Sequence, residues 1–157
     1  MKSIISKTAT LLAICAAMSS FSPKPGGEGF EIYLGNKLLT QQFGSKINDV
    51  KSLQLSQSSY NDELTIKYYH CGKAGKNRSV TIKDGQNNVL KVFHFSDAAA
   101  PVAAMTVKVK DILNLTAGPN GKKGNNITLK LYYSSTELPG GRLLASIVTG
   151  NTTGTNP

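Results

Sequence analysis

The sequence has few of the residues on which several protein classes depend. It contains only two cysteines, Cys15 and Cys71, so a disulfide-rich scaffold is excluded. It has no tryptophan, and charged residues make up 17% of the chain, below the usual value of about 25%. No apolar run reaches the roughly 18 residues of a membrane-spanning helix. These deficits exclude a coiled coil, a long-helix protein and a multi-pass membrane protein.

The first twenty residues have the pattern of a secretory signal peptide. Lys2 and Lys7 precede an uncharged stretch, 8–20, with an apolar centre at 11–17. Small residues at Ala17 and Ser19 predict cleavage after Ser19. The alternative is a lipoprotein signal with lipid attachment at Cys15. That motif needs a small residue directly before the cysteine, and Ile14 occupies this position. We therefore expect a signal peptide at 1–19, an extended leader at 20–28, a folded domain at 29–149 and a flexible tail at 150–157.

Export places the mature protein in the periplasm, on the cell surface or outside the cell. Cleavage removes Lys2 and Lys7, which lowers the formal net charge from +9 to +7 and leaves a basic protein. It also removes Cys15, so Cys71 has no partner within the mature chain. We expect Cys71 to be buried and inert, the alternative being a disulfide between two chains.

Apolar residues alternate with polar ones throughout the mature chain, which is the pattern of half-buried strands. Short Gly-rich or Asn-rich turns separate several of these segments, including Gly35-Asn36 and the stretch 84–88. A basic loop is expected at 72–77, an exposed loop at 117–126 and a turn at 137–141. One helical turn is expected at 111–115, capped by Asp111. The expected strands are 30–34, 37–43, 53–55, 64–71, 79–83, 89–95, 105–110, 127–133 and 142–148.

Eight or nine short strands with one apolar face each predict two packed sheets. Strands joined by tight turns must be antiparallel, so the predicted fold is all-β, a single antiparallel β-sandwich. A closed barrel is the alternative, because periodicity alone does not separate the two. The predicted core consists of Phe30, Ile32, Leu34, Leu64, Ile66, Val80, Ile82, Val92, Val107, Val109, Leu129, Leu131 and Ile147.

The residues that could carry catalysis or bind a metal do not form a recognisable site. His70 and Cys71 are neighbours on an expected strand, so they point to opposite faces and cannot share one ion or one proton. His94 lacks metal-ligand spacing to either of them. No nucleophile motif, phosphate loop or dinucleotide fingerprint is present. We therefore expect no metal, no cofactor and no enzymatic activity.

Lysine and tyrosine side chains occupy outward positions on many of the expected strands. Such lysines protect strand edges against aggregation, which is a sufficient structural reason for them. They also form a surface on which ammonium groups attract anions and aromatic rings supply flat stacking faces. The residues predicted to form this binding surface are Lys67, Tyr69, Lys108, Lys110, Lys130 and Tyr132.

Two stretches, 68–78 (YYHCGKAGKNR) and 132–142 (YYSSTELPGGR), together with the export signal, resemble short secreted β-sandwich proteins of Bacteroidetes-type bacteria. The resemblance spans most of the mature chain. It implies a β-domain of the bacterial envelope or the extracellular space, and it carries no functional residue over to this chain.

These observations together favour a non-catalytic binding module. The expected partner is an anionic polysaccharide, an envelope surface including that of the membrane, or an envelope protein. A structural envelope component is the alternative, and a small hydrolase is the third class. Nucleic acid is not expected, because the chain is exported and has only two arginines, Arg78 and Arg142, for bidentate contacts.

Overall fold

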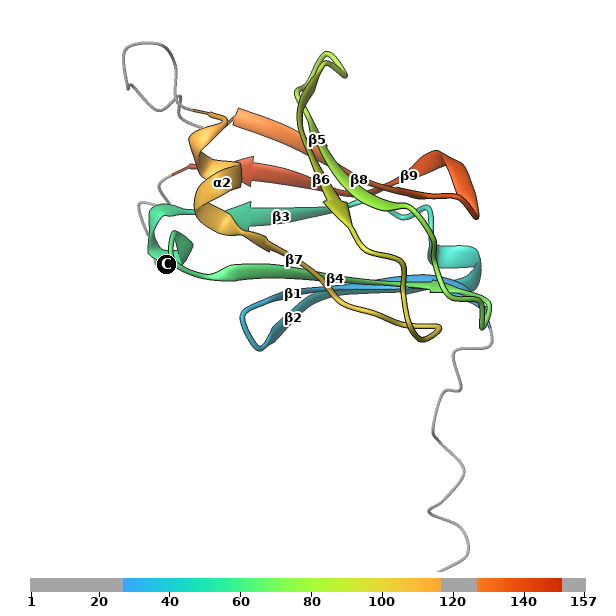
Figure 1. Ribbon diagram of the computed structural model, residues 1–157. Helices are drawn as coiled ribbons and strands as arrows, with labels where there is room; N and C mark the ends of the chain where they lie inside the picture. The colour runs from blue at the N-terminus through green and yellow to red at the C-terminus, as the bar shows by residue number, and fades with distance from the viewer. Residues whose placement is uncertain (1–26, 117–126, 151–157) are drawn as a thin grey trace, which may run out of the picture.

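The computed structural model describes residues 27–116 and 127–150, and these residues form two β-sheets packed face to face (Figure 1). The predicted signal peptide, nearly all of the leader and tail, and the loop at 117–126 lie outside the described residues. The strands are β1 (Glu28–Leu34), β2 (Lys37–Phe43), β3 (Lys51–Leu55), β4 (Glu63–His70), β5 (Arg78–Lys83), β6 (Val89–Phe95), β7 (Met105–Lys108), β8 (Ile127–Ser135) and β9 (Leu138–Thr149). The short helices are η1 (Gly44–Lys46), η2 (Gln57–Ser59) and α2 (Val109–Asn114).

The strand order confirms the predicted β-sandwich. One sheet has four strands in the order β2-β1-β4-β7, and the other has five in the order β3-β9-β8-β5-β6. The expected hairpins β1-β2 and β5-β6 are present and antiparallel. One pairing differs from the expectation, because β3 runs parallel to β9. The tight-turn argument applies only to strands that follow each other in sequence, and β3 and β9 do not.

Alternating side chains from both sheets fill the interior. Phe30, Ile32, Leu64, Ile82 and Leu129 are among the side chains with no solvent exposure. Eleven of the thirteen predicted core residues are buried, and the other two, Leu34 and Val92, are half-buried. Leu34 still packs against the core. On β6 the predicted register was wrong, because Phe93 and Phe95 face the core and Val92 faces outward.

Two predicted boundaries were also wrong. The helix α2 begins at Val109 with Lys108 as its N-cap, so Asp111 lies inside its first turn and does not cap it. β8 and β9 are joined by the two residues Thr136 and Glu137, and the predicted turn at 137–141 is mostly strand. Pro139 is tolerated in β9 because β3 pairs only with residues 145–149, so the backbone of β9 has no second neighbour at Pro139.

The loop between β4 and β5, expected at 72–77 as a basic loop, passes from one sheet to the other. Backbone hydrogen bonds hold it in place, since Ala98 N donates to Gly75 O at 2.8 Å and Thr136 N donates to Lys76 O at 2.9 Å. It lies at the end of the sandwich opposite to α2 (Figure 1). No helix within the described residues is long and apolar enough to cross a membrane.

Candidate functional site

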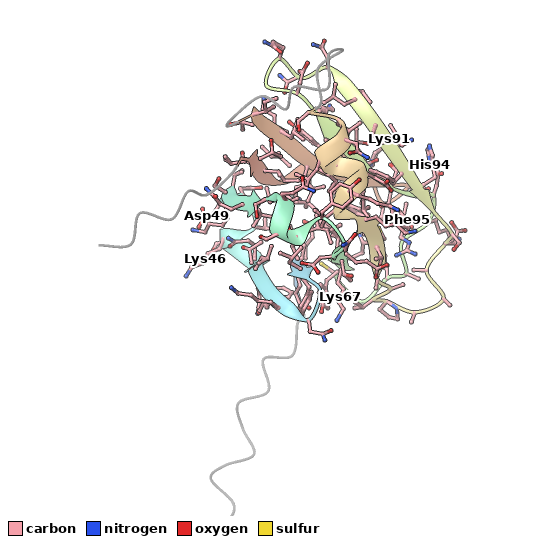
Figure 2. The ribbon with its side chains drawn as sticks, turned by 90° about the vertical axis from the view of Figure 1, so that its left-hand side faces the viewer. Lys46, Asp49, Lys67, Lys91, His94 and Phe95 are labelled. Atoms are coloured by element: carbon pink, nitrogen blue, oxygen red, sulfur yellow. The ribbon has the colours of Figure 1, made fainter. Side chains whose placement is uncertain are left out.

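The predicted lysine and tyrosine surface is divided between the two outer faces of the sandwich. Lys67 and Tyr69 lie on the outer face of β4, in the four-stranded sheet. Lys130 and Tyr132 lie on the outer face of β8, in the five-stranded sheet. Figure 2 shows Lys67 on one side of the molecule and His94, which belongs to the five-stranded sheet, on another. One ligand therefore cannot contact the whole predicted set on a flat surface.

Lys108 and Lys110 lie at the β7 edge of the four-stranded sheet. Lys108 ends β7 directly opposite Glu63 of β4, and Lys110 is in α2, so its predicted place on a strand was wrong. Both border a shallow hollow of about 190 Å³ that Asp62 and Glu63 also line. Because two carboxylates share this hollow with two lysines, its charges offset each other.

The outer face of the four-stranded sheet carries an aromatic pair. Gly29 of β1 lies between Phe43 of β2 and Tyr69 of β4, and the two ring centroids are 5.1 Å apart in an edge arrangement. A Cβ on Gly29 would lie 2.0 Å from Phe43 Cδ1, so only glycine allows the ring to cross β1. The two rings cover the backbone of Gly29, so both have a structural role on this face.

A carboxylate occupies the centre of the same face. Tyr33 Oη donates a hydrogen bond of 2.7 Å to Glu31, which raises the pKa of Tyr33 above its ordinary value. Burial and the neighbouring Glu31 raise the pKa of Tyr69 to about 12. Lys67 Nζ lies 4.8 Å from the centroid of the Tyr33 ring. The tyrosines here are thus already engaged around Glu31, and this face carries both signs of charge.

The outer face of the five-stranded sheet is different, because two lysines oppose each other on it. Lys83 of β5 and Lys130 of β8 are direct cross-strand partners. Lys83 Nζ lies 4.4 Å from the centroid of the Tyr132 ring. Lys130 Nζ donates to Asn87 Oδ1 at 2.7 Å and to Gly85 O at 3.3 Å, so it also holds the β5-β6 turn. Like charges in direct opposition destabilise a sheet unless something else offsets them.

No carboxylate lies at an outward strand position of this face among the described residues. The nearest acid along the chain is Asp84, in the β5-β6 turn. Its carboxylate accepts hydrogen bonds from the backbone and side chain of Asn88, both at 2.8 Å. These bonds lower the pKa of Asp84, with a smaller contribution from Lys130. The face around Lys83, Lys130 and Tyr132 is therefore positively charged.

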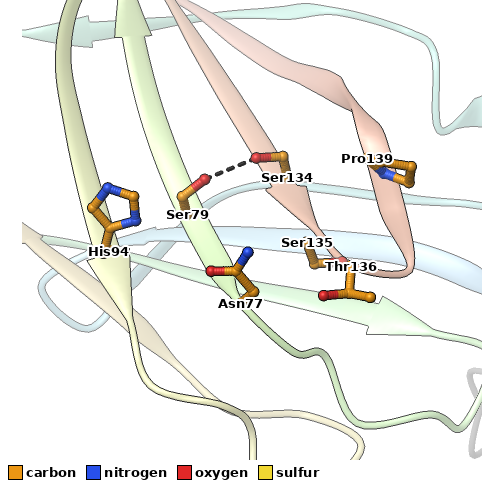
Figure 3. Close-up of a pocket in the computed structure, with 7 residues that line it drawn as sticks. All are labelled: Asn77, Ser79, His94, Ser134, Ser135, Thr136 and Pro139. Carbon is orange, nitrogen blue, oxygen red and sulfur yellow. Dashed lines mark hydrogen bonds between the residues drawn. The ribbon is translucent and has the colours of Figure 1, made fainter.

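A polar hollow lies on the same outer face, two residues along β8 from Tyr132 (Figure 3). Ser79 of β5 has His94 of β6 as its partner on one side and Ser134 of β8 on the other. The two serine hydroxyls share a hydrogen bond of 2.8 Å. The hollow has a volume of about 270 Å³ and is also lined by Asn77, Ser135, Thr136 and Pro139. The sequence pattern pointed to His94 only as a possible metal ligand and gave no prediction that the two serines belong to a site.

The inner faces become polar at this end of the sandwich. Tyr68 and Tyr133, from opposite sheets, stack with their ring centroids 4.3 Å apart. His70 Nε2 lies 2.8 Å from Tyr133 Oη and 3.3 Å from Ser135 Oγ. Burial lowers the pKa of His70, which therefore favours the neutral ring. These groups form hydrogen bonds with one another inside the protein, so we assign them a structural role.

Both arginines also serve the fold. The guanidinium of Arg78 is buried and donates to the carbonyl oxygens of Ser96 and Ala103, with distances of 2.7–3.0 Å. Arg142 donates to Tyr68 Oη at 2.9 Å and forms an ion pair with Glu28 at 3.0 Å. Neither guanidinium is therefore free to bind a ligand from solution.

Cys71 is exposed, so the prediction of a buried thiol was wrong. β4 ends at His70, and Cys71 takes a left-handed backbone conformation with φ of 52°, which turns the chain away from the strand. Within the described residues, no group of three or more His, Cys, Asp or Glu side chains is placed to hold a metal ion.

Of the two outer faces, only that of the five-stranded sheet has lysines but no acidic residue at its described strand positions. The polar hollow lies on this same face. No protein-family model matches this chain, and no curated protein sequence is similar to it.

Proposed function

We propose that the protein is a non-catalytic module that binds an anionic glycan of the cell envelope on the outer face of the five-stranded sheet. The observation that carries this proposal is the direct opposition of Lys83 and Lys130 beside the half-buried Tyr132. Two ammonium groups on one face attract carboxylate, sulfate or phosphate groups of a polysaccharide. The tyrosine ring offers a flat apolar surface for the face of a sugar.

The outer face of the five-stranded sheet is better suited to an anion than that of the four-stranded sheet, because the two faces differ in charge. Glu31 and Glu63 repel an anion from the surface around Lys67 and Lys108, whereas no carboxylate occupies the strand positions around Lys83 and Lys130. Export of the mature chain would bring this surface to envelope polysaccharides. The strands fix the backbone positions of these residues, so binding requires no ordering of a loop.

Retention on immobilised polygalacturonate, a polymer of uronic acid, tests the proposal. The Lys83→Gln/Lys130→Gln variant removes both charges and keeps an N–H donor near Asn87. At roughly 0.7 kcal/mol for each surface cation, it should bind about ten-fold more weakly than the original chain. Binding of the original chain should also fall as salt rises past about 0.15 M, where the screening length is about 8 Å.

The matched control is the Lys67→Gln/Lys108→Gln variant. It removes the same charge from the opposite sheet and should keep most of the affinity. Equal losses in the two double variants would mean that net charge alone causes retention, and the assignment to the five-stranded sheet would then be rejected. Circular dichroism of both variants checks that the sandwich is intact.

A further inference from the structure

The hollow on the five-stranded sheet has the composition of a sugar subsite and not of an ion site. Hydroxyl groups come from Ser79, Ser134 and Thr136, an amide from Asn77 and an imidazole from His94. No lysine, arginine, aspartate or glutamate lines it. Figure 3 shows these side chains gathered from three separate stretches of the chain around one depression. A ligand here would meet neutral hydrogen-bonding groups.

Several of these groups retain hydrogen-bonding capacity. In the Ser79–Ser134 bond one hydroxyl donates and the other accepts, which leaves one O–H donor and three acceptor lone pairs between them. The structure gives the Thr136 hydroxyl and the Asn77 side-chain amide no hydrogen bond to another described residue. Together they offer adjacent donors and acceptors, which is the pattern that vicinal hydroxyls of a sugar ring satisfy.

Hydrogen bonds hold the backbone of the hollow at two of its residues. Asn77 N donates to Asp97 Oδ1 at 2.7 Å, and Thr136 N donates to Lys76 O at 2.9 Å. His94 and Pro139 stand on opposite sides of the serine pair (Figure 3). At about 270 Å³, the hollow is slightly below the usual range for a drug-sized ligand, so it accommodates one ring and not a longer segment.

We infer that this hollow is a subsite for a single uncharged saccharide ring. The inference extends the proposed function, because the hollow continues the outer face of β8 beyond Tyr132. A glycan chain would place a neutral ring among the hydroxyls and its acidic groups near Lys83 and Lys130. The subsite itself recognises hydroxyl groups and requires no charge.

Amide chemical shifts measured during titration with neutral sugars test this inference. The ¹⁵N-labelled chain would be titrated separately with glucose, mannose, galactose and N-acetylglucosamine, each to about 50 mM, which detects millimolar dissociation constants. At least one sugar should shift the amide signals of residues 77–79 and 134–136. The inference is overturned if none of the four does so.

Two variants identify the groups involved. Ser79→Ala/Ser134→Ala removes both partners of one hydrogen bond, so the fold should tolerate it. Thr136→Val replaces an exposed hydroxyl by a methyl group. Each should weaken sugar binding roughly five-fold or more, the value of one hydrogen bond. The matched control Thr128→Val, at the other end of β8, should leave binding unchanged. Shifts that persist in both variants would also overturn the inference.

The two proposals can fail separately. The Lys83→Gln/Lys130→Gln variant should keep the shifts caused by the neutral sugar, because neither lysine lines the hollow. If polygalacturonate retention proves independent of these lysines while the sugar shifts remain, the subsite stands and the anionic-glycan proposal falls. If retention depends on the lysines and no neutral sugar shifts the hollow, only the subsite is rejected.

Discussion

Gly75 lies against Tyr133 so closely that a side chain at this position would be crowded. A Cβ built on Gly75 would lie 3.0 Å from Tyr133 Oη and 3.2 Å from His70 Nε2. The loop from β4 to β5 therefore covers the hydrogen bond between these two side chains, whose atoms are 2.8 Å apart. Close packing of this loop, together with its backbone hydrogen bonds, keeps His70 and Tyr133 buried at the polar end of the interior.

The first prediction concerns this contact. Gly75→Ala should lower the free energy of unfolding by about 1–3 kcal/mol, because overpacking displaces Tyr133, His70 or Arg78. Urea denaturation measures the change. The matched control is Gly85→Ala, since a Cβ on Gly85 meets no atom within 4 Å. An equal loss in the two variants would contradict the steric explanation.

The second prediction is a pH dependence caused by His70. Burial lowers the pKa of its ring below 6.5, Arg78 acts in the same direction, and Glu137 and Glu28 oppose them. The unfolded chain therefore binds a proton at a higher pH than the folded one does. Stability from this group is complete above pH 6.5 and is lost as the pH falls towards the folded pKa.

Urea denaturation between pH 7.5 and pH 5 measures this loss. The range lies above the ordinary pKa of the carboxylates, so they contribute little to it. His70→Gln should show a flatter dependence than the original chain. His94→Gln alters an exposed histidine and should show the original slope. If His70→Gln left the slope unchanged, the loss of stability would have another origin.

Much of the fold was predictable because strand alternation is a local property. The pattern from Leu64 to His70 identified correctly which side chains of β4 face inward. The assignment of each strand to a sheet is not local, since strands of both sheets have the same alternation. Lys67 and Lys130 therefore looked alike in the sequence, although the structure places them on opposite outer faces.

The polar hollow could not be predicted for a related reason. It depends on the cross-strand register that aligns Ser79 with both His94 and Ser134. Nothing in the three separate stretches of sequence specifies this alignment. A local signal did exist, because Ser79 and Ser134 are small polar residues at outward positions of otherwise bulky strands, but such residues also occur where no site exists.

The third prediction tests the core. Leu129 on β8 has no solvent exposure, so Leu129→Ala should lower the free energy of unfolding by about 2–5 kcal/mol. Its neighbour Thr128 points outward, and Thr128→Ala should change stability by less than about 0.5 kcal/mol. Thermal or urea denaturation compares the two. Reversed values would mean that β8 has the opposite register.

The last prediction concerns the reactivity of Cys71. Its side chain is exposed at the start of the β4-β5 loop, so the thiol should react with a colorimetric thiol reagent in the absence of denaturant. The measurement uses the chain without residues 1–19, because Cys15 would add a second thiol. Adding urea should increase the rate only modestly, since the folded state already admits the reagent. A thiol that reacts only after unfolding would contradict the exposed position. Non-reducing electrophoresis of the same sample then shows whether this accessible thiol also joins two chains, and Cys71→Ser is the control in which any such dimer must disappear.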